Sequence, residues 1–248
     1  MRGIDPRAAG VRRSTGAAMA AALVAVVALL VSGCGATRDP GPATSADRPI
    51  SGVQAVRLET SGDLAIAVGD TESLTIEAGS AVIDDLTSDV VDGSLVLGTR
   101  PGTSVTGSIR YTLTVTGLSR LELEGSGNAS GTGVLLSDAT VTVSGSGNAT
   151  LSGLELTRLI ADLSGSGHVT VAGTAGSAAV TVSGSGDFDG TGLAVQDATV
   201  DASGSGRVQV RVSGTLTAAA SGSGDVVYTG NPATVQRDRS GSGDIVAG

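Results

Sequence analysis

Ser164-Gly165-Ser166-Gly167 contains one copy of a Gly-Ser-Gly tripeptide that recurs through the second half of this 248-residue chain. The copies begin at Gly125, Gly145, Gly165, Gly184, Gly204, Gly222 and Gly241. The steps between them are 20, 20, 19, 20, 18 and 19 residues. Such a period is typical of stacked repeats, because a unit of about twenty residues cannot bury an apolar face without a neighbour on each side. The tripeptide therefore predicts a solenoid.

Apolar residues alternate on both sides of each tripeptide. Around Gly165 they stand at Ala161, Leu163 and Val169, which are four and two residues before it and four after it. Alternation with a period of two marks a strand with one buried face. The glycines fall at the same alternating positions as the apolar residues. This predicts that they point inward, where another wall of the coil approaches closely. The serines are expected to point outward.

A third glycine follows eight residues after the start of most copies. It occurs at Gly133, Gly153, Gly173, Gly192 and Gly230, and a short apolar run often comes next. This spacing predicts two or three short strands per turn, each paired in parallel with the next turn at about 4.8 Å. The predicted fold is an all-β, right-handed parallel β-helix with about 20 residues per coil. The aromatic content of 1% suits its thin core.

The last coil breaks the apolar pattern. Arg237 and Arg239 occupy two positions that are apolar in the earlier copies, and Asp238 lies between them. Charged substitutions in a terminal repeat discourage end-to-end association. We expect the two guanidinium groups to reach solvent while their stems cover Ala218 and Ala220.

The first 33 residues have the composition of a secretory signal. Four arginines precede an uncharged apolar run of about 15 residues from Ala17 to Val31, which is short for a membrane span. Val31-Ser32-Gly33-Cys34 resembles the lipobox of bacterial lipoproteins. The resemblance implies cleavage before Cys34, a diacylglyceryl thioether on its sulfur, and a lipid-anchored, extracytoplasmic location at the cell membrane. The alternatives are an ordinary cleaved signal or a chance cysteine. Cys34 is the only cysteine, so a single chain forms no disulfide.

The part from Cys34 onward divides into a tether and one domain. Residues 34–49 lack periodicity and hold three of the six prolines, which predicts a flexible tether. Residues 50–248 are expected to form a single solenoid domain. From Cys34 on there are 11 arginines and 23 acidic residues, a formal charge of −12, which argues against a nucleic-acid partner.

Residues 50–118 alternate with a less regular period. The segments around Val56, 64–68, Leu74, Leu95 and 109–115 are expected to be strands, and residues 81–86 one short helical turn.

The order of these segments resembles the head-GIN family of autotransporter-adhesin proteins. The matching stretches are Gln54-Ala-Val-Arg-Leu-Glu-Thr-Ser-Gly-Asp-Leu-Ala-Ile, Ser73-Leu-Thr-Ile-Glu-Ala, Asp92-Gly-Ser-Leu-Val-Leu and the Gly-Ser-Gly-Asn coils. The resemblance covers nearly all of the chain after Cys34. It implies a parallel β-solenoid that displays an adhesin-like surface.

The position after each tripeptide forms one outward column. It is occupied by Asn128, Asn148, His168, Asp187, Arg207, Asp225 and Asp244. Carboxylates are calcium ligands, so Asp225 and Asp244 are the calcium candidates. Calcium-binding glycine repeats, however, recur every nine residues with an aspartate in each copy, whereas four of these seven positions lack one. The structural interpretation, a polar ladder, is favoured, and His168 then serves as a polar member of it and not as a catalytic base.

These patterns predict a non-catalytic module for binding, adhesion or spacing. No cofactor is expected, and the partner classes are the membrane, a cell-envelope glycan or a surface protein. Three competing interpretations are a carbohydrate-active β-helix enzyme, an ice- or surface-binding solenoid that uses the serine ladder, and an accessory domain in envelope signalling. An enzyme needs a cleft with converging acids, whereas a binder needs only a flat repeated face.

Lipidation of Cys34 makes a direct prediction about location. Cys34→Ala removes the thiol that carries the lipid, so the variant should leave the membrane fraction and appear in the soluble or the uncleaved form. Fractionation and labelling with a fatty-acid probe measure this. Unchanged fractionation without labelling of the parent chain would exclude the anchor.

Overall fold

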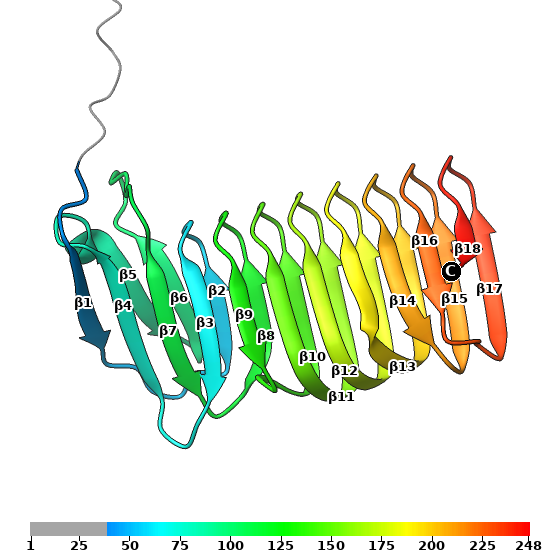
Figure 1. Ribbon diagram of the computed structural model, residues 1–248, viewed down its shortest axis with the longest axis horizontal. Helices are drawn as coiled ribbons and strands as arrows, with labels where there is room; N and C mark the ends of the chain where they lie inside the picture. Colours follow the sequence, from blue (N-terminus) through cyan, green and yellow to red (C-terminus); the bar gives the residue numbers. More distant parts are fainter. Residues whose placement is uncertain (1–38) are drawn as a thin grey trace, which may run out of the picture. The chain divides into compact units, whose positions relative to one another are not determined.

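The structure is a computed structural model that describes residues 39–248, and strands dominate it (Figure 1). The signal peptide, Cys34 and residues 34–38 of the predicted tether lie outside the described residues. One 3₁₀ turn, η1, spans Ile83–Asp85. The strands are β1 Ala43–Arg48, β2 Ala55–Leu58, β3 Asp63–Val68, β4 Ser73–Gly79, β5 Leu86–Val91, β6 Ser94–Thr99, β7 Arg110–Val115, β8 Leu118–Leu123, β9 Ala129–Thr132, β10 Leu135–Val143, β11 Ala149–Leu163, β12 Val169–Val182, β13 Phe188–Ala202, β14 Val208–Val212, β15 Thr215–Ala220, β16 Val226–Thr229, β17 Thr234–Arg239 and β18 Ile245–Ala247.

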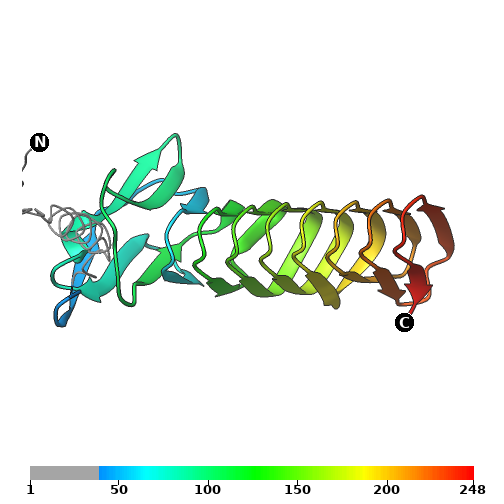
Figure 2. The same ribbon diagram turned by 90° about the horizontal axis from the view of Figure 1, so that it is seen from above.

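The repeats form a parallel-strand solenoid, as the sequence predicts. In β11 and β12 the register pairs Ala149 with Val169 and Leu163 with Val182, so equivalent residues of successive copies lie side by side. A register shift between Leu151 and Leu154 bends the coil next to Gly153, whose φ is +60°. Figure 2 shows successive coils stacked along the long axis of this unit.

Two parallel sheets build the walls of the solenoid. The entry sheet contains the strands that lead into each Gly-Ser-Gly arch: β2, β8, β10, the second halves of β11, β12 and β13, then β15 and β17. The exit sheet contains the strands that leave each arch: β3, β9, the first halves of β11, β12 and β13, then β14, β16 and β18. Alternate residues of both sheets meet in one core of Val, Leu, Ile and Ala side chains.

The arches stack directly on one another along the upper edge in Figure 1. The amides of Ser164 and Gly165 donate to the carbonyl of Val143 at 3.0 and 3.3 Å, and Ser166 donates to Gly145 at 3.1 Å. A Cβ at Gly165 would collide with the Gly145 carbonyl oxygen and lie 2.5 Å from that of Ser144. The expected inward direction of these glycines is therefore wrong: the missing Cβ faces the backbone of the preceding rung. Glycine is required because the rungs approach closely.

An eighth arch precedes the seven that the tripeptide marks. Thr60-Ser61-Gly62 occupies this place, and a Cβ at Gly127 would collide with the Gly62 carbonyl oxygen. Gly62 donates from its amide to Thr60 Oγ1 at 3.2 Å, and Thr60 Oγ1 donates to the Tyr111 hydroxyl at 3.3 Å. Burial raises the pKa of the Tyr111 phenol. The first coil is thus 65 residues long, and its extra residues form a cap.

The cap extends both sheets with antiparallel strands at the end of the unit that carries β1 (Figure 1). In the exit sheet, β3 pairs in parallel with β7, followed by the antiparallel pairs β7–β4 and β4–β1. In the entry sheet, β2 pairs in parallel with β6, which forms an antiparallel hairpin with β5. Asp92 and Gly93 make its two-residue turn with φ values of 50° and 77°, the signature of a type I′ turn.

The cap corrects two expectations and confirms others. Residues 43–48, assigned by sequence to the flexible tether 34–49, form β1, and the compact unit begins at Asp39 and not at residue 50. The strands expected around Val56, 64–68, Leu74, Leu95 and 109–115 are confirmed, but pairing in this part is partly antiparallel.

The last coil carries its arginines at the surface. Arg237 and Arg239 pair in register with Ala218 and Ala220, which are each only 1% exposed. The Arg237 guanidinium hydrogen-bonds the Tyr228 hydroxyl, with its central carbon 5.2 Å from the ring centroid. Arg239 reaches Asp244 at 2.5 Å. The guanidinium groups and the alanines beneath them thus lie as expected.

The close stacking of the arches predicts a large effect of a single methyl group. Gly165→Ala should lower the free energy of unfolding by about 1 to 3 kcal/mol, because its Cβ pushes two rungs apart. Ser166→Ala, one position along on the exposed side, should change it by about 0.5 kcal/mol or less. Urea titration of both variants measures the difference, and equal effects would contradict the arch geometry.

Candidate functional surfaces

A ladder of polar side chains follows the exit side of the arches. Asn148 Nδ2 donates to Asn128 Oδ1 at 2.9 Å, and the amide of His168 donates to Asn148 Oδ1 at 3.0 Å. Asn128 Nδ2 in turn donates to Asp63 Oδ1 at 2.8 Å. Asp63 follows the arch at Thr60-Ser61-Gly62, so the ladder also includes this arch, which the sequence did not predict. Each Asn or Asp thus supplies an oxygen to the next rung, which is the structural role that the sequence favours.

The calcium candidates belong to the same ladder. Asp225 Oδ1 accepts the amide of Asp244 at 2.9 Å, and Asp244 Oδ1 is paired with Arg239. Both carboxylates therefore already have partners. In the part of the chain that the structure describes, no group of three or more His, Cys, Asp or Glu side chains is placed to hold a metal ion.

The ladder bond is absent at two described rungs, those of His168 and Arg207. His168 Nε2 instead lies 3.5 Å from Asp187 Oδ2, and both side chains are about half exposed at 58% and 47%. Arginine has no acceptor to offer to Asp225. Such exposed pairs add little stability, and the geometry gives His168 no nucleophile or partner to activate.

The outer surface of the entry sheet carries a small charged network. Arg57 Nε lies 2.8 Å from Glu122 Oε2 and 3.4 Å from Glu124 Oε1. The hydrogen bond and the charge of Glu122 raise the pKa of Arg57. Arg120 adds a longer contact of 3.8 Å to Glu122. Mutual neutralisation of these groups explains the network without a ligand.

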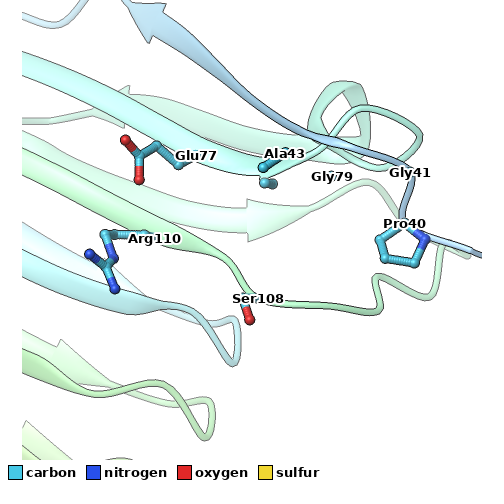
Figure 3. A pocket seen from close by; sticks show the side chains of 8 residues that line it. Pro40, Gly41, Ala43, Glu77, Gly79, Ser108 and Arg110 are labelled. Atoms are coloured by element: carbon cyan, nitrogen blue, oxygen red, sulfur yellow. The ribbon is translucent and has the colours of Figure 1, made fainter.

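An open hollow of 420 Å³ lies in the cap between the chain before β1, the end of β4 and the start of β7. Figure 3 shows Glu77 and Arg110 at one end of the hollow and Pro40 at the other. These two side chains are its ionisable groups and are cross-strand neighbours in β4 and β7. The hollow brings together no pair of acids of the kind that a glycoside hydrolase requires.

Two outward rows of the exit sheet carry no charge from β4 to β12, and we name them the hydroxyl face; the next outward row, toward the arches, carries Glu77, Arg110 and Asp63. The first row of the hydroxyl face crosses six adjacent strands in register: Thr75, Thr112, Ala65, Ser130, Thr150 and Thr170. Its second row contains Ser73, Thr114 and Ala67, then Thr132 and Ser152. The first row ends at a carboxylate on each side, Asp47 beside Thr75 and Asp189 beside Thr170.

A shallow hollow of 470 Å³ lies in the middle of the hydroxyl face. Ala67, Val68 and Thr132 are among the residues that line it, and Val68 is 51% exposed. Thr132 and Ser152 share a hydrogen bond of 2.9 Å between their hydroxyls. All three aromatic side chains of the chain are buried, so this face offers small hydroxyls and methyls and no stacking platform. Sequence reasoning missed the face because half of its strands, β4, β7 and β3, lie outside the Gly-Ser-Gly repeat.

The comparisons with known proteins identify the family. The profile described as "Putative auto-transporter adhesin, head GIN domain" matches residues 53–232. The chain belongs to this family, which confirms the resemblance drawn from sequence. No curated protein matches the chain. In residues 39–248 no helix is both long and apolar enough to cross a membrane.

Solved structures with the same fold include a putative adhesin from Bacteroides fragilis, 20% identical, with a TM-score of 0.76 over 83% of this chain and 97% of that one. A putative adhesin from Parabacteroides merdae is also 20% identical, with a TM-score of 0.62 over 83% and 97%. A protein from Parabacteroides distasonis described as a putative lipid binding protein is 20% identical, with a TM-score of 0.65 over 83% and 97%. These likenesses establish the parallel-strand solenoid as a shared fold.

The polar ladder predicts that substitutions at two neighbouring rungs change the free energy of unfolding in opposite directions. Asn148→Ala removes the acceptor of the His168 amide and should lower the free energy of unfolding by about 1 to 2 kcal/mol. His168→Asn supplies the missing oxygen to the next rung and should raise it by about 0.5 to 1.5 kcal/mol. Urea titration measures both, with Ser146→Ala as the control. A loss of stability in His168→Asn would contradict the ladder.

Proposed function

We propose that the chain is a lipid-anchored, extracytoplasmic recognition module that displays the hydroxyl face to an extended, uncharged partner such as a cell-envelope glycan. Cys34 supplies the anchor, and the solenoid supplies a rigid support. Its membership of a family described as adhesins supports a binding role. The observation that carries the proposal is the run of Ser, Thr and Ala across β4, β7, β3, β9, β11 and β12.

The composition of the hydroxyl face favours this class of partner. A chain with 23 acidic residues after Cys34 presents six adjacent strands without a charge in the first row, so a neutral partner confined to the two rows of the hydroxyl face desolvates no charge within them. The hydroxyls recur at the strand spacing of about 4.8 Å on both sides of β3, where Ala65 and Ala67 interrupt the series, and they offer repeated donors and acceptors. Neither the hollow in the cap nor the hollow on the hydroxyl face is lined by a pair of acids.

A binding test on two opposite surfaces addresses this function. Immobilised peptidoglycan and neutral polysaccharides should retain the chain, and Ser130→Arg with Thr150→Arg should weaken retention at least tenfold, because two long charged side chains then cover the middle of the face. The matched control is Thr199→Arg with Thr217→Arg on the entry sheet, where both threonines are exposed and adjacent in register. Equal retention of both variants would contradict the proposal.

A further inference from the structure

Within residues 39–248, β5 is an edge strand that pairs with β6 alone. The two-residue turn at Asp92 and Gly93 fixes which residues of β5 face that neighbour. In such a hairpin the residues that flank the turn form a hydrogen-bonded pair, and hydrogen-bonded and non-bonded pairs then alternate. Thr87, Asp89 and Val91 therefore bond to β6. Ser88 and Val90 direct their amides and carbonyls toward the open edge.

This edge has little of the usual protection against pairing with another chain. Edge strands are commonly blocked by charged side chains, especially lysine, by proline or by a bulge. β5, Leu86-Thr87-Ser88-Asp89-Val90-Val91, has no lysine, proline or bulge; its charged residue is Asp89, and Val91 is 57% exposed. Leu86 contributes a free carbonyl only, because its amide already donates to Ile83.

We propose that β5 is a homodimerisation site, at which the β5 strands of two copies pair antiparallel about a two-fold axis at Ser88. In this register the two Ser88 residues exchange both of their backbone hydrogen bonds. Each Val90 amide also donates to the Leu86 carbonyl of the second copy. Every free backbone group of Ser88 then has a partner, and the two entry sheets join into one continuous sheet.

Side-chain charges select this register over its neighbours. With the axis at Ser88, Asp89 of one copy faces Thr87 of the other, whose hydroxyl can donate to the carboxylate. With the axis moved one residue to Asp89, the two Asp89 carboxylates face each other in a close non-bonded pair, which is unfavourable. Moving it to Thr87 places Asp89 opposite Asp85. Only the Ser88 register keeps the carboxylates apart and uses all three outward-facing residues.

The position of β5 suits two copies held at one surface. β5 and the start of the described chain lie at the same end of the solenoid (Figure 1). Few backbone bonds form, so the contact is weak in solution and is favoured when two chains are confined together. The dimer is independent of the hydroxyl face, which lies on the exit sheet, and its test measures association and not ligand binding.

Cysteine cross-linking tests the register. In the full-length Cys34→Ala chain, Ser88→Cys places two thiols on residues whose Cα atoms are about 5.5 Å apart, within the 4.4–6.8 Å range of a disulfide. Mild oxidation should give a covalent dimer. Two control variants should give at least tenfold less covalent dimer. Asp89→Cys places the thiols on residues that do not face each other in this register, and Thr112→Cys places them on the exit sheet. Equal cross-linking at all three positions, or none at Ser88, would overturn the proposal.

A charge substitution tests the same contact without cross-linking. Thr87→Glu sets a second carboxylate against Asp89 of the other copy and should weaken dimerisation at least tenfold in sedimentation equilibrium at high concentration. Thr87→Lys should strengthen it. Unchanged melting temperatures confirm that both variants fold. Association that responds to neither substitution would show that another surface mediates it.

Discussion

The close contact between each arch glycine and a backbone carbonyl of the preceding arch sets the geometry of the whole solenoid. Because no Cβ stands between them, the amides of one arch reach the carbonyls of the previous arch, as Ser166 reaches Gly145 at 3.1 Å. Both sheets then continue at the strand spacing through the turn, where an ordinary loop would leave backbone groups unpaired. The glycine costs conformational entropy, and the hydrogen bonds that it permits offset that cost in every rung.

Tight stacking of the arches dictates which side chains can follow them. The residue after each tripeptide lies above its equivalent, so an Asn or Asp can offer an oxygen to the amide of the next rung, as Asn148 does for His168. The same column could be mistaken for a metal site because it gathers carboxylates. The hydrogen bonds distinguish the two, since the oxygen of Asp225 is directed at a backbone amide.

The sequence predicts the repeated half well because one periodic constraint acts on every coil. It predicts the cap less well. Thr60-Ser61-Gly62 escapes notice since threonine replaces the first glycine, and only the approach of Gly127 to Gly62 reveals the arch. β1 carries small and charged residues without an apolar alternation, and its backbone pairing with β4 makes it a strand. The direction of the glycine Cβ positions was not predictable either. The alternation of residues along a strand tells which side chains face the core and which face solvent, but it does not show that a Cβ would point at the neighbouring rung.

The candidate surface could not be predicted from the repeat, because its strands come from both the cap and the coils. Outward positions of a sheet are not fixed by core packing, and farther along the exit sheet they carry Asp189, Gln209 and Arg211. From β4 to β12 the first row nevertheless holds only Ser, Thr and Ala, across parallel and antiparallel pairs alike. Neither strand pairing nor the arch geometry requires that restriction. The uncharged partner proposed for this face would favour the restriction, since each charge added in these rows would have to be desolvated on contact.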